Sequence, residues 1–183
     1  MSELRAVDRL IQRRRFVVAA HAVPEGAEIL DIGCSDGAWF EHLGGRIAPS
    51  TGVDPELAES VVTPSGHALV RGTVKDLPKA ATFDCFTALA VLEHFETSTL
   101  LELGHDLRSR ARPGSVLVAT IPSPAVDRLL DVGIRLHFLA GMEAVQHHGE
   151  AVEAIIATLE LSGWAVRKHR RFELGLNHLF VLS

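Results

Sequence analysis

A short apolar run that ends near an aspartate and is followed by two closely spaced glycines constrains the fold of this chain most. Residues 29–40 read ILDIGCSDGAWF. The run predicts a buried strand that carries Asp31, then a turn containing Gly33 and Gly37, then a helix that begins near Gly37. A strand, a glycine-containing turn and a helix form the repeating unit of open α/β sheets, whose ligands bind at the carboxyl ends of the strands.

The rest of the chain continues the alternation of short apolar runs and helical segments. After a helix over residues 3–21, helices are expected to begin near Gly37, Pro55, Val74 and Thr97. The expected central strands are Glu28–Ile32, Thr51–Asp54, His67–Arg71, Phe83–Leu89 and Ser115–Ile121. This pattern predicts one domain spanning residues 1–183, with a parallel sheet covered by helices on both faces.

The last third of the chain has a different pattern. A helix is predicted over Ala151–Leu161, followed by strands at Trp164–Leu174 and His178–Leu182. Because only Gly175–Asn177 separates these strands, they are expected to form an antiparallel hairpin rather than another crossover. Before them lies a long apolar insertion at about residues 122–150, and insertions of this length in compact domains are commonly functional lids.

The composition limits which partners the protein is expected to bind and in which cellular compartment it is expected. A net charge of −5 argues against general polyanion binding, and the basic runs Arg13–Arg15 and Arg167–Arg171 are interpreted as solvated faces, so no nucleic acid is expected. The chain has neither an apolar signal core near its start nor an apolar stretch of about 20 residues. We therefore expect a cytoplasmic protein without membrane insertion, whose two cysteines, Cys34 and Cys85, are reduced and buried.

The glycine spacing narrows the choice of ligand. A dinucleotide fold needs a bare glycine in the middle of its turn, where pyrophosphate approaches the backbone, and Ser35 stands at that position. Asp31 would repel a pyrophosphate but attract an ammonium group. A second carboxylate, Asp54, ends the next strand and can accept both hydroxyls of a ribose. These residues favour a ligand with an amine, a carboxylate and a ribose.

From LDIGCSDG through GVDPE, the DLP turn, FDCFTALAVLEHF and RPGSVLVATIPSP, the sequence resembles the class I S-adenosylmethionine-dependent methyltransferases. The resemblance implies a Rossmann-like seven-stranded sheet with order 3-2-1-4-5-7-6 and an antiparallel strand 7. It also implies S-adenosylmethionine as cofactor and S-adenosylhomocysteine as product. The cofactor-binding residues that it implies are Asp31, Gly33, Ser35, Gly37, Asp54, Thr73, Val74 and Leu89. Two of them depart from the family pattern, because Ser35 replaces a glycine and Thr73 stands where relatives often have an aspartate.

Methyl transfer to a hydroxyl group would benefit from a base, for which histidine is the usual choice. The candidates are His94, which follows the fourth predicted strand, and His147 and His148, which close the insertion. Small-RNA 2′-O-methyltransferases of the same superfamily have a Glu-x-x-Glu-His metal motif at this strand. Only Glu93 and His94 match it, and Ala90 replaces the first glutamate, so no metal is expected.

Three functions compete at this stage. The leading one is methyl transfer to a small-molecule or lipid-like acceptor by in-line displacement, favoured by the apolar insertion. The second is a methyltransferase-like module that binds cofactor or a partner without turnover, suggested by Ser35, Thr73 and the lack of a definite base. The third, a nicotinamide-dependent oxidoreductase, is disfavoured by the glycine spacing.

Overall fold

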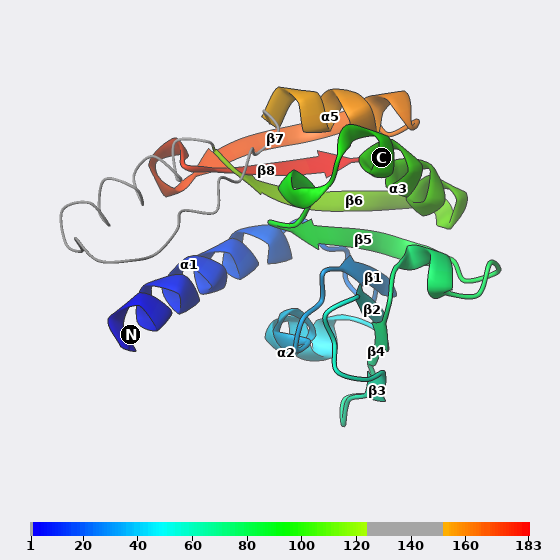
Figure 1. Ribbon diagram of the computed structural model, residues 1–183, viewed down its shortest axis with the longest axis horizontal. Helices are drawn as coiled ribbons and strands as arrows, with labels where there is room; N and C mark the ends of the chain where they lie inside the picture. Colours follow the sequence, from blue (N-terminus) through cyan, green and yellow to red (C-terminus); the bar gives the residue numbers. More distant parts are fainter. Residues whose placement is uncertain (1, 124–151) are drawn as a thin grey trace.

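The computed structural model describes residues 2–123 and 152–183, which form one mixed β-sheet with helices on both faces (Figure 1). The expected lid-like insertion falls almost entirely on residues 124–151, outside the described residues. None of the helices within the described ranges combines the length and apolar character that crossing a bilayer requires. The α-helices are α1 (Ser2–Ala20), α2 (Ala38–Leu43), α3 (Thr97–Ser109) and α5 (Val152–Leu161).

The sheet order is β3-β4-β2-β1-β5-β6-β8-β7. Strands β1, β2, β4, β5 and β6 pair in parallel, which follows from the alternation of apolar runs and crossovers in the sequence. The strands are β1 (Ile29–Ile32), β2 (Thr51–Asp54), β3 (Val61–Val62), β4 (Ala68–Arg71), β5 (Phe83–Leu89), β6 (Ala111–Pro122), β7 (Val166–Phe172) and β8 (Asn177–Leu182).

The predicted seven-strand order is wrong, because the sheet has eight strands. The additional strand is β3, which pairs antiparallel with β4 and becomes the edge of the sheet. It contains two exposed valines, Val61 and Val62, and a strand of two residues leaves too weak an alternation to be recognised in a sequence. The other seven strands differ from the predicted order only by this insertion.

Two predicted helices are also wrong. Instead of a helix near Pro55, residues 55–60 form turns and bends. The Asp54 carboxylate accepts a hydrogen bond from the Glu56 N–H (2.8 Å) and so closes a local turn in place of a helix. Near Val74 the chain makes only the 3₁₀ turn η2 (Val74–Asp76).

The C-terminal strands form the predicted antiparallel hairpin. Strand β8 pairs antiparallel with both β6 and β7, and the 3₁₀ turn η4 (Glu173–Gly175) connects β7 to β8. Because β8 runs against β6, its first residues lie at the carboxyl end of the parallel strands, with Asn177 opposite Pro122. The hairpin therefore contributes side chains to the edge of the sheet where a ligand is expected.

Two clusters of buried apolar side chains, one on each face, stabilise the sheet. Helices α3 and α5 cover one face, on which Leu30, Phe86 and Leu117 are fully buried. Helices α1 and α2 cover the other, which includes Ile29, Val118 and the α1 residue Phe16. The two predicted thiols, Cys34 and Cys85, are free and buried.

A buried arginine fixes the segment between β4 and β5. The guanidinium of Arg110, a residue only 7% exposed, donates hydrogen bonds to four backbone carbonyls. These belong to Val74 (3.2 Å), Leu77 (3.4 Å), Pro78 (2.6 Å) and Ala81 (3.4 Å). The carbonyls of Val74 and Pro78 also accept backbone hydrogen bonds from Leu77 N and Ala81 N, whereas for the Leu77 and Ala81 carbonyls Arg110 is the donor that the described residues provide. One side chain thus completes the hydrogen bonding of a loop that has little regular structure of its own.

Arg110→Met is expected to lower the free energy of unfolding by about 2–4 kcal/mol, because it removes four hydrogen bonds and leaves the Leu77 and Ala81 carbonyls without a donor among the described residues. Denaturant titration measures the change. Lys75→Met is the matched control in the same segment, since Lys75 pairs with Glu102 at the surface, where both side chains are more than 60% exposed. It should lower the free energy by less than about 1 kcal/mol. Equal effects of the two substitutions would contradict a special role for Arg110.

Candidate active site

Asp31 lies buried at the centre of the carboxyl edge, on β1 between β2 and β5. Its side chain is 4% exposed, and Oδ1 accepts a hydrogen bond from the Thr87 hydroxyl of β5 at 2.5 Å. Asp31 and Thr87 are register neighbours in the parallel pair, so both side chains point to the same face. The buried strand β1 thus places a carboxylate in the interior of the protein.

Burial raises the pKa of Asp31 to about 7. The hydrogen bond from Thr87 lowers this pKa, whereas the negative charge of Asp54 raises it further. Desolvation dominates because a carboxylate in a protein interior loses the hydration that stabilises its charged form. Within the described part of the chain no cation forms a salt bridge with Asp31, and a bound ammonium group would supply one.

The loop after β1 has the sharp backbone conformation that its glycines predict. Gly33 and Gly37 have φ values of 74° and 78°. A Cβ on Gly33 would lie 2.9 Å from the side chain of Val91, so the backbone can pass only because glycine has none. Ser35 has φ of 47°, the left-handed conformation that the usual glycine of the motif would adopt freely. The departure at Ser35 thus keeps the loop shape at a backbone cost of about 1 kcal/mol.

Asp54 supports this loop from the end of β2. Its Oδ2 accepts a hydrogen bond from the Ser35 N–H at 2.9 Å, and its Oδ1 accepts one from the Glu56 N–H at 2.8 Å. Each carboxylate oxygen can accept a further hydrogen bond. Asp54 therefore joins the first and second strands at the carboxyl edge, where its remaining capacity is available to a ligand.

Thr73 and Val74 stand at the start of η2, next to the end of β4. The Thr73 hydroxyl accepts a hydrogen bond from Lys75 N, and the Asp76 carboxylate in turn accepts one from Thr73 N at 2.7 Å. This capping box fixes the turn. Gly72 N donates to Asp54 O at 3.1 Å, so the turn is attached to the end of β2. Thr73 thereby serves local structure, whereas the buried Val74 borders the apolar core.

A pocket brings together part of the predicted set. Of the predicted cofactor residues, Asp31, Gly33, Ser35 and Leu89 line it. The other four predicted residues do not line the pocket: Gly37, Asp54, Thr73 and Val74. Asp54, however, accepts a hydrogen bond from the N–H of the lining residue Ser35. The other lining residues are Gln12, Arg15, Phe16, Cys34, Asp36, Ala38 and Trp39. A second pocket, lined by residues such as Pro24 and Pro113, lies at the opposite edge of the sheet.

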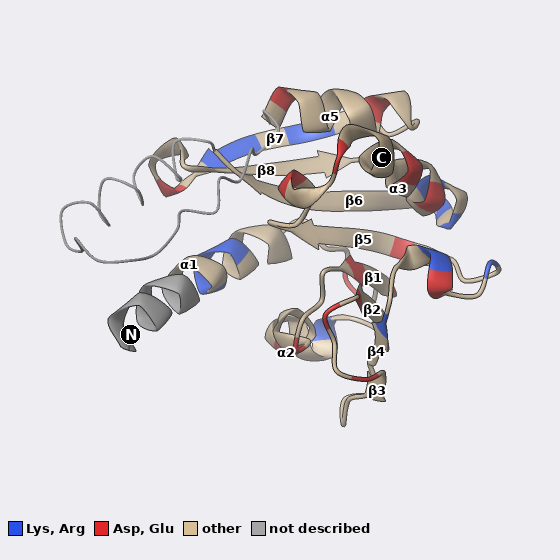
Figure 2. Ribbon diagram, in the orientation of Figure 1, with Lys and Arg blue, Asp and Glu red and all other residues tan. Residues whose placement is uncertain are grey.

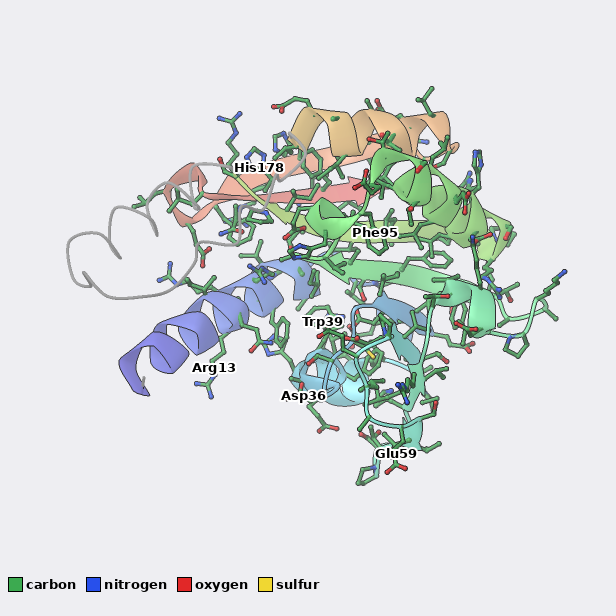
Figure 3. The ribbon with its side chains drawn as sticks, viewed as in Figure 1. Arg13, Asp36, Trp39, Glu59, Phe95 and His178 are labelled. Atoms are coloured by element: carbon green, nitrogen blue, oxygen red, sulfur yellow. The ribbon has the colours of Figure 1, made fainter. Side chains whose placement is uncertain are left out.

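Arg15 is a site residue that sequence analysis missed. It was interpreted as part of a solvated face, but it lines the same pocket as Asp31. Its Nε is buried and has no hydrogen-bond partner within the described residues, and the same holds for Nε1 of Trp39, another lining residue. Burial lowers the pKa of Arg15, an effect opposed by the carboxylates of Glu93 and Glu173. Arg13, by contrast, projects from the exposed side of α1 (Figure 3).

Further polar groups lie beside Leu89, on the face of the sheet that α1 covers. Thr120 is the register partner of Leu89 and is fully buried. Asn177 lies on the same face of β8, 4% exposed, and its Nδ2 donates to Glu173 at 2.5 Å. Thr120 Oγ1 and Asn177 Oδ1 have no hydrogen-bond partner among the described residues. Because unpaired buried polar atoms are uncommon, these two indicate a place for a polar ligand atom.

The described residues include only one of the three predicted histidines. His94 ends the 3₁₀ turn η3 (Leu92–His94) directly after β5, and its side chain is exposed. His147 and His148 lie outside the described residues. Within the described ranges, no three His, Cys, Asp or Glu side chains come together in a group that could hold a metal ion.

Comparison with known proteins identifies relatives of the whole fold. A family model described as a methyltransferase domain matches residues 4–172. The mitochondrial ubiquinone biosynthesis O-methyltransferase of Schizosaccharomyces pombe is 28% identical over 150 residues, which are 76% of this chain. The chain spans about half the length of this curated relative, 53% of which is covered.

Solved structures show the same fold at low sequence identity. The N-methyltransferase NodS of Bradyrhizobium japonicum matches with a TM-score of 0.63 and 17% identity, covering 96% of this chain and 97% of that one. Magnesium protoporphyrin IX methyltransferase of Synechocystis, solved with bound S-adenosylhomocysteine, matches with a TM-score of 0.61 and 18% identity. That match covers 95% of this chain and 80% of the other.

Asp31→Asn is expected to stabilise the ligand-free protein above pH 7. The folded-state pKa of about 7 exceeds the ordinary value of 3.8, so the folded protein holds the proton more tightly than the unfolded chain. Stability from this group is full below pH 4 and is lost as the pH rises to 7. Denaturant titrations at pH 5 and 8 should show the variant gaining roughly 2 kcal/mol or more on the parent at pH 8. A pH-independent difference would contradict the buried, uncompensated carboxylate.

Proposed function

The chain belongs to the methyltransferase-domain family, and from this premise we propose that it transfers a methyl group from S-adenosylmethionine to a small-molecule or lipid-like acceptor by in-line displacement. The methyltransferase motifs of its first two strands support this proposal, as does a pocket at the carboxyl edge of the sheet. An ubiquinone O-methyltransferase among the relatives is consistent with a small-molecule acceptor.

One observation carries the proposal: the pocket places a buried carboxylate and a half-buried guanidinium, whose Nε is buried, on the walls of the same space. Among the described residues no cation forms a salt bridge with Asp31, and the Arg15 Nε has no partner there. The amino-acid part of S-adenosylmethionine carries one ammonium and one carboxylate. Asp31 would hold the ammonium, while Arg15, with the indole N–H of Trp39, would hold the carboxylate. The residues present therefore fit this cofactor.

The nucleoside part of the cofactor would extend along the edge toward β2 and β4. Asp54 would accept the ribose hydroxyls with the capacity that its two backbone hydrogen bonds leave. Thr73 and Val74, in the turn that Gly72 attaches to β2, would border the adenine. Gly33, Ser35 and Gly37 would let the ligand approach the backbone of the first loop.

When bound, the cofactor supplies an electrophilic methyl group on a sulfonium. The chain's own residues would hold and align the acceptor and exclude water, which for an in-line displacement can provide much of the catalysis. Leu89 would form the apolar wall beside the reacting atoms. Thr120 on β6 and Asn177 on β8, one and two strands further along the sheet, would bind polar atoms of the acceptor.

A hydroxyl acceptor would also need a base. We assign this role to the predicted histidines, of which His94 follows β5 at the correct edge of the sheet. His147 and His148 remain candidates from their sequence position. The competing idea of a module without turnover rested on Ser35, Thr73 and the lack of a definite base, and Ser35 keeps the left-handed loop conformation. The loop geometry therefore gives no reason at this position to favour the inactive module.

S-adenosylhomocysteine is expected to raise the thermal midpoint of the protein, and NAD is not. At a concentration 100 times the Kd, a ligand specific for the native state adds about 2.7 kcal/mol, which for a domain of this size corresponds to roughly 5–10 °C. Asp54→Ala should reduce or remove the shift, because it deletes the acceptor for the ribose hydroxyls. Its ligand-free midpoint serves as the control for folding. A shift with NAD but none with S-adenosylhomocysteine would refute the proposed function.

Arg15→Gln is expected to weaken S-adenosylhomocysteine binding by about ten-fold to a hundred-fold, since a charged hydrogen bond contributes roughly 1.5–3 kcal/mol. Calorimetry measures the change. 5′-Methylthioadenosine lacks the amino-acid part, so its binding should be unaffected by this substitution. Arg13→Gln, on the exposed side of the same helix, is the matched control and should change neither affinity. Equal loss for both ligands in the Arg15 variant would show that Arg15 does not contact the amino-acid part.

A further inference from the structure

Strand β7 carries a dense basic strip at the edge of the sheet. Its residues 167–171 are all exposed, and four of them are Arg or Lys: Arg167, Lys168, Arg170 and Arg171 (Figure 2). The fifth, His169, stacks on Phe180 with ring centroids 4.2 Å apart. No carboxylate within the described residues forms a salt bridge with this basic strip, although the whole chain contains 23 acidic and 18 basic residues.

The basic strip leads directly into an exposed leucine. Leu174, three residues after Arg171, is fully exposed at 103% and has φ of 58°. Its neighbours Glu173 and Gly175 also have positive φ, so the backbone of η4 turns left-handed and presents this side chain outward. Both the exposure and the backbone conformation are unfavourable for a leucine in water. A partner that buries the side chain would offset this cost.

Protection of a sheet edge does not explain this combination. Charged side chains do keep edge strands from pairing with other chains, but charges of either sign serve that purpose. Here all four are positive in an acidic chain, and the exposed leucine next to them would promote association rather than prevent it. The basic strip and Leu174 together fit a partner that is both anionic and apolar.

We propose that the basic strip and Leu174 form a peripheral docking surface for an anionic lipid bilayer. The four basic side chains would contact lipid phosphates, and Leu174 would enter the boundary between headgroups and acyl chains. Such binding is reversible and needs no membrane-spanning helix. A nucleic acid fits less well, because single strands are bound by stacking on exposed aromatic rings. On β7 the only phenylalanine, Phe172, is buried, and His169 already stacks on Phe180.

The position of the surface connects it to the acceptor. Strand β7 ends at the carboxyl edge, and η4 joins it to Asn177, one of the two buried residues assigned to the acceptor. A bilayer held there would border the acceptor side of the pocket. An acceptor that partitions into membranes fits this arrangement, and this step alone rests on the proposed function.

The test is co-sedimentation of the whole protein with vesicles of phosphatidylcholine alone or with 30% phosphatidylglycerol. Binding is expected only to the anionic vesicles and should fall in 0.5 M NaCl. Arg170→Gln should weaken partitioning by roughly five-fold, the effect of one basic residue near an anionic surface. Leu174→Asn should weaken it by a similar factor without lowering the thermal midpoint, since asparagine tolerates the left-handed conformation.

Two matched controls distinguish this surface from general attraction. Arg13→Gln removes an exposed arginine of α1, and Leu161→Asn removes a leucine that is 77% exposed at the end of α5. Both should retain parental binding. The proposal is overturned if anionic vesicles do not bind the protein, if either control loses as much as its partner variant, or if only an oligonucleotide binds. Binding of S-adenosylhomocysteine is measured separately, so failure of vesicle binding leaves the proposed function standing.

Discussion

The site depends on how closely the loop after β1 packs against the end of β2. The N–H groups of Gly33 and Cys34 both donate to Val53 O, at 2.9 and 3.3 Å, and Ser35 N donates to Asp54. This packing is possible only because residue 52 is a glycine. A Cβ there would lie 2.7 Å from the sulfur of Cys34 and closer still to its Cβ. The two strands thus fix the loop that carries Ser35 beside Asp31, which the pairing of β1 with β2 and β5 holds in place.

Strands were predictable where burial dominated the local sequence. The segments of β1, β2 and β5 are short apolar runs bounded by turns, and their ends fell within one residue of prediction. The segment after Asp54 was not predictable in this way. Its polar character gave no period, and the structure there depends on a carboxylate that closes a turn and on two valines that pair with β4. The turn at Asp54 is local, whereas the pairing of the two valines with β4 exists only after the sheet has formed.

The pocket residues that come from the strands and the turns after them could be predicted from the sequence, whereas a pocket residue from helix α1 was missed. Asp31, Gly33 and Leu89 come from motifs whose spacing is set by strand and turn geometry. Arg15 was assigned to a solvated face because it follows Arg13 and Arg14. In the structure Arg13 and Arg14 are exposed, whereas Arg15 lies toward the side of α1 that packs against the sheet and is half-buried. The buried Phe16 next to it was the available signal.

The same geometry explains why an unfavourable carboxylate is kept in the protein. Asp31 is costly where it stands, because burial raises its pKa, and among the described residues Thr87 is the one side chain whose hydrogen bond offsets that cost. A cationic side chain of the protein that formed a salt bridge with Asp31 would remove this cost, but it would fill the pocket and exclude a ligand. Arg15 instead lines the other part of the same pocket, with its own Nε unpaired within the described chain. A ligand that carries both charges would satisfy both residues at once, so the cost of burying Asp31 would become selectivity for a zwitterion.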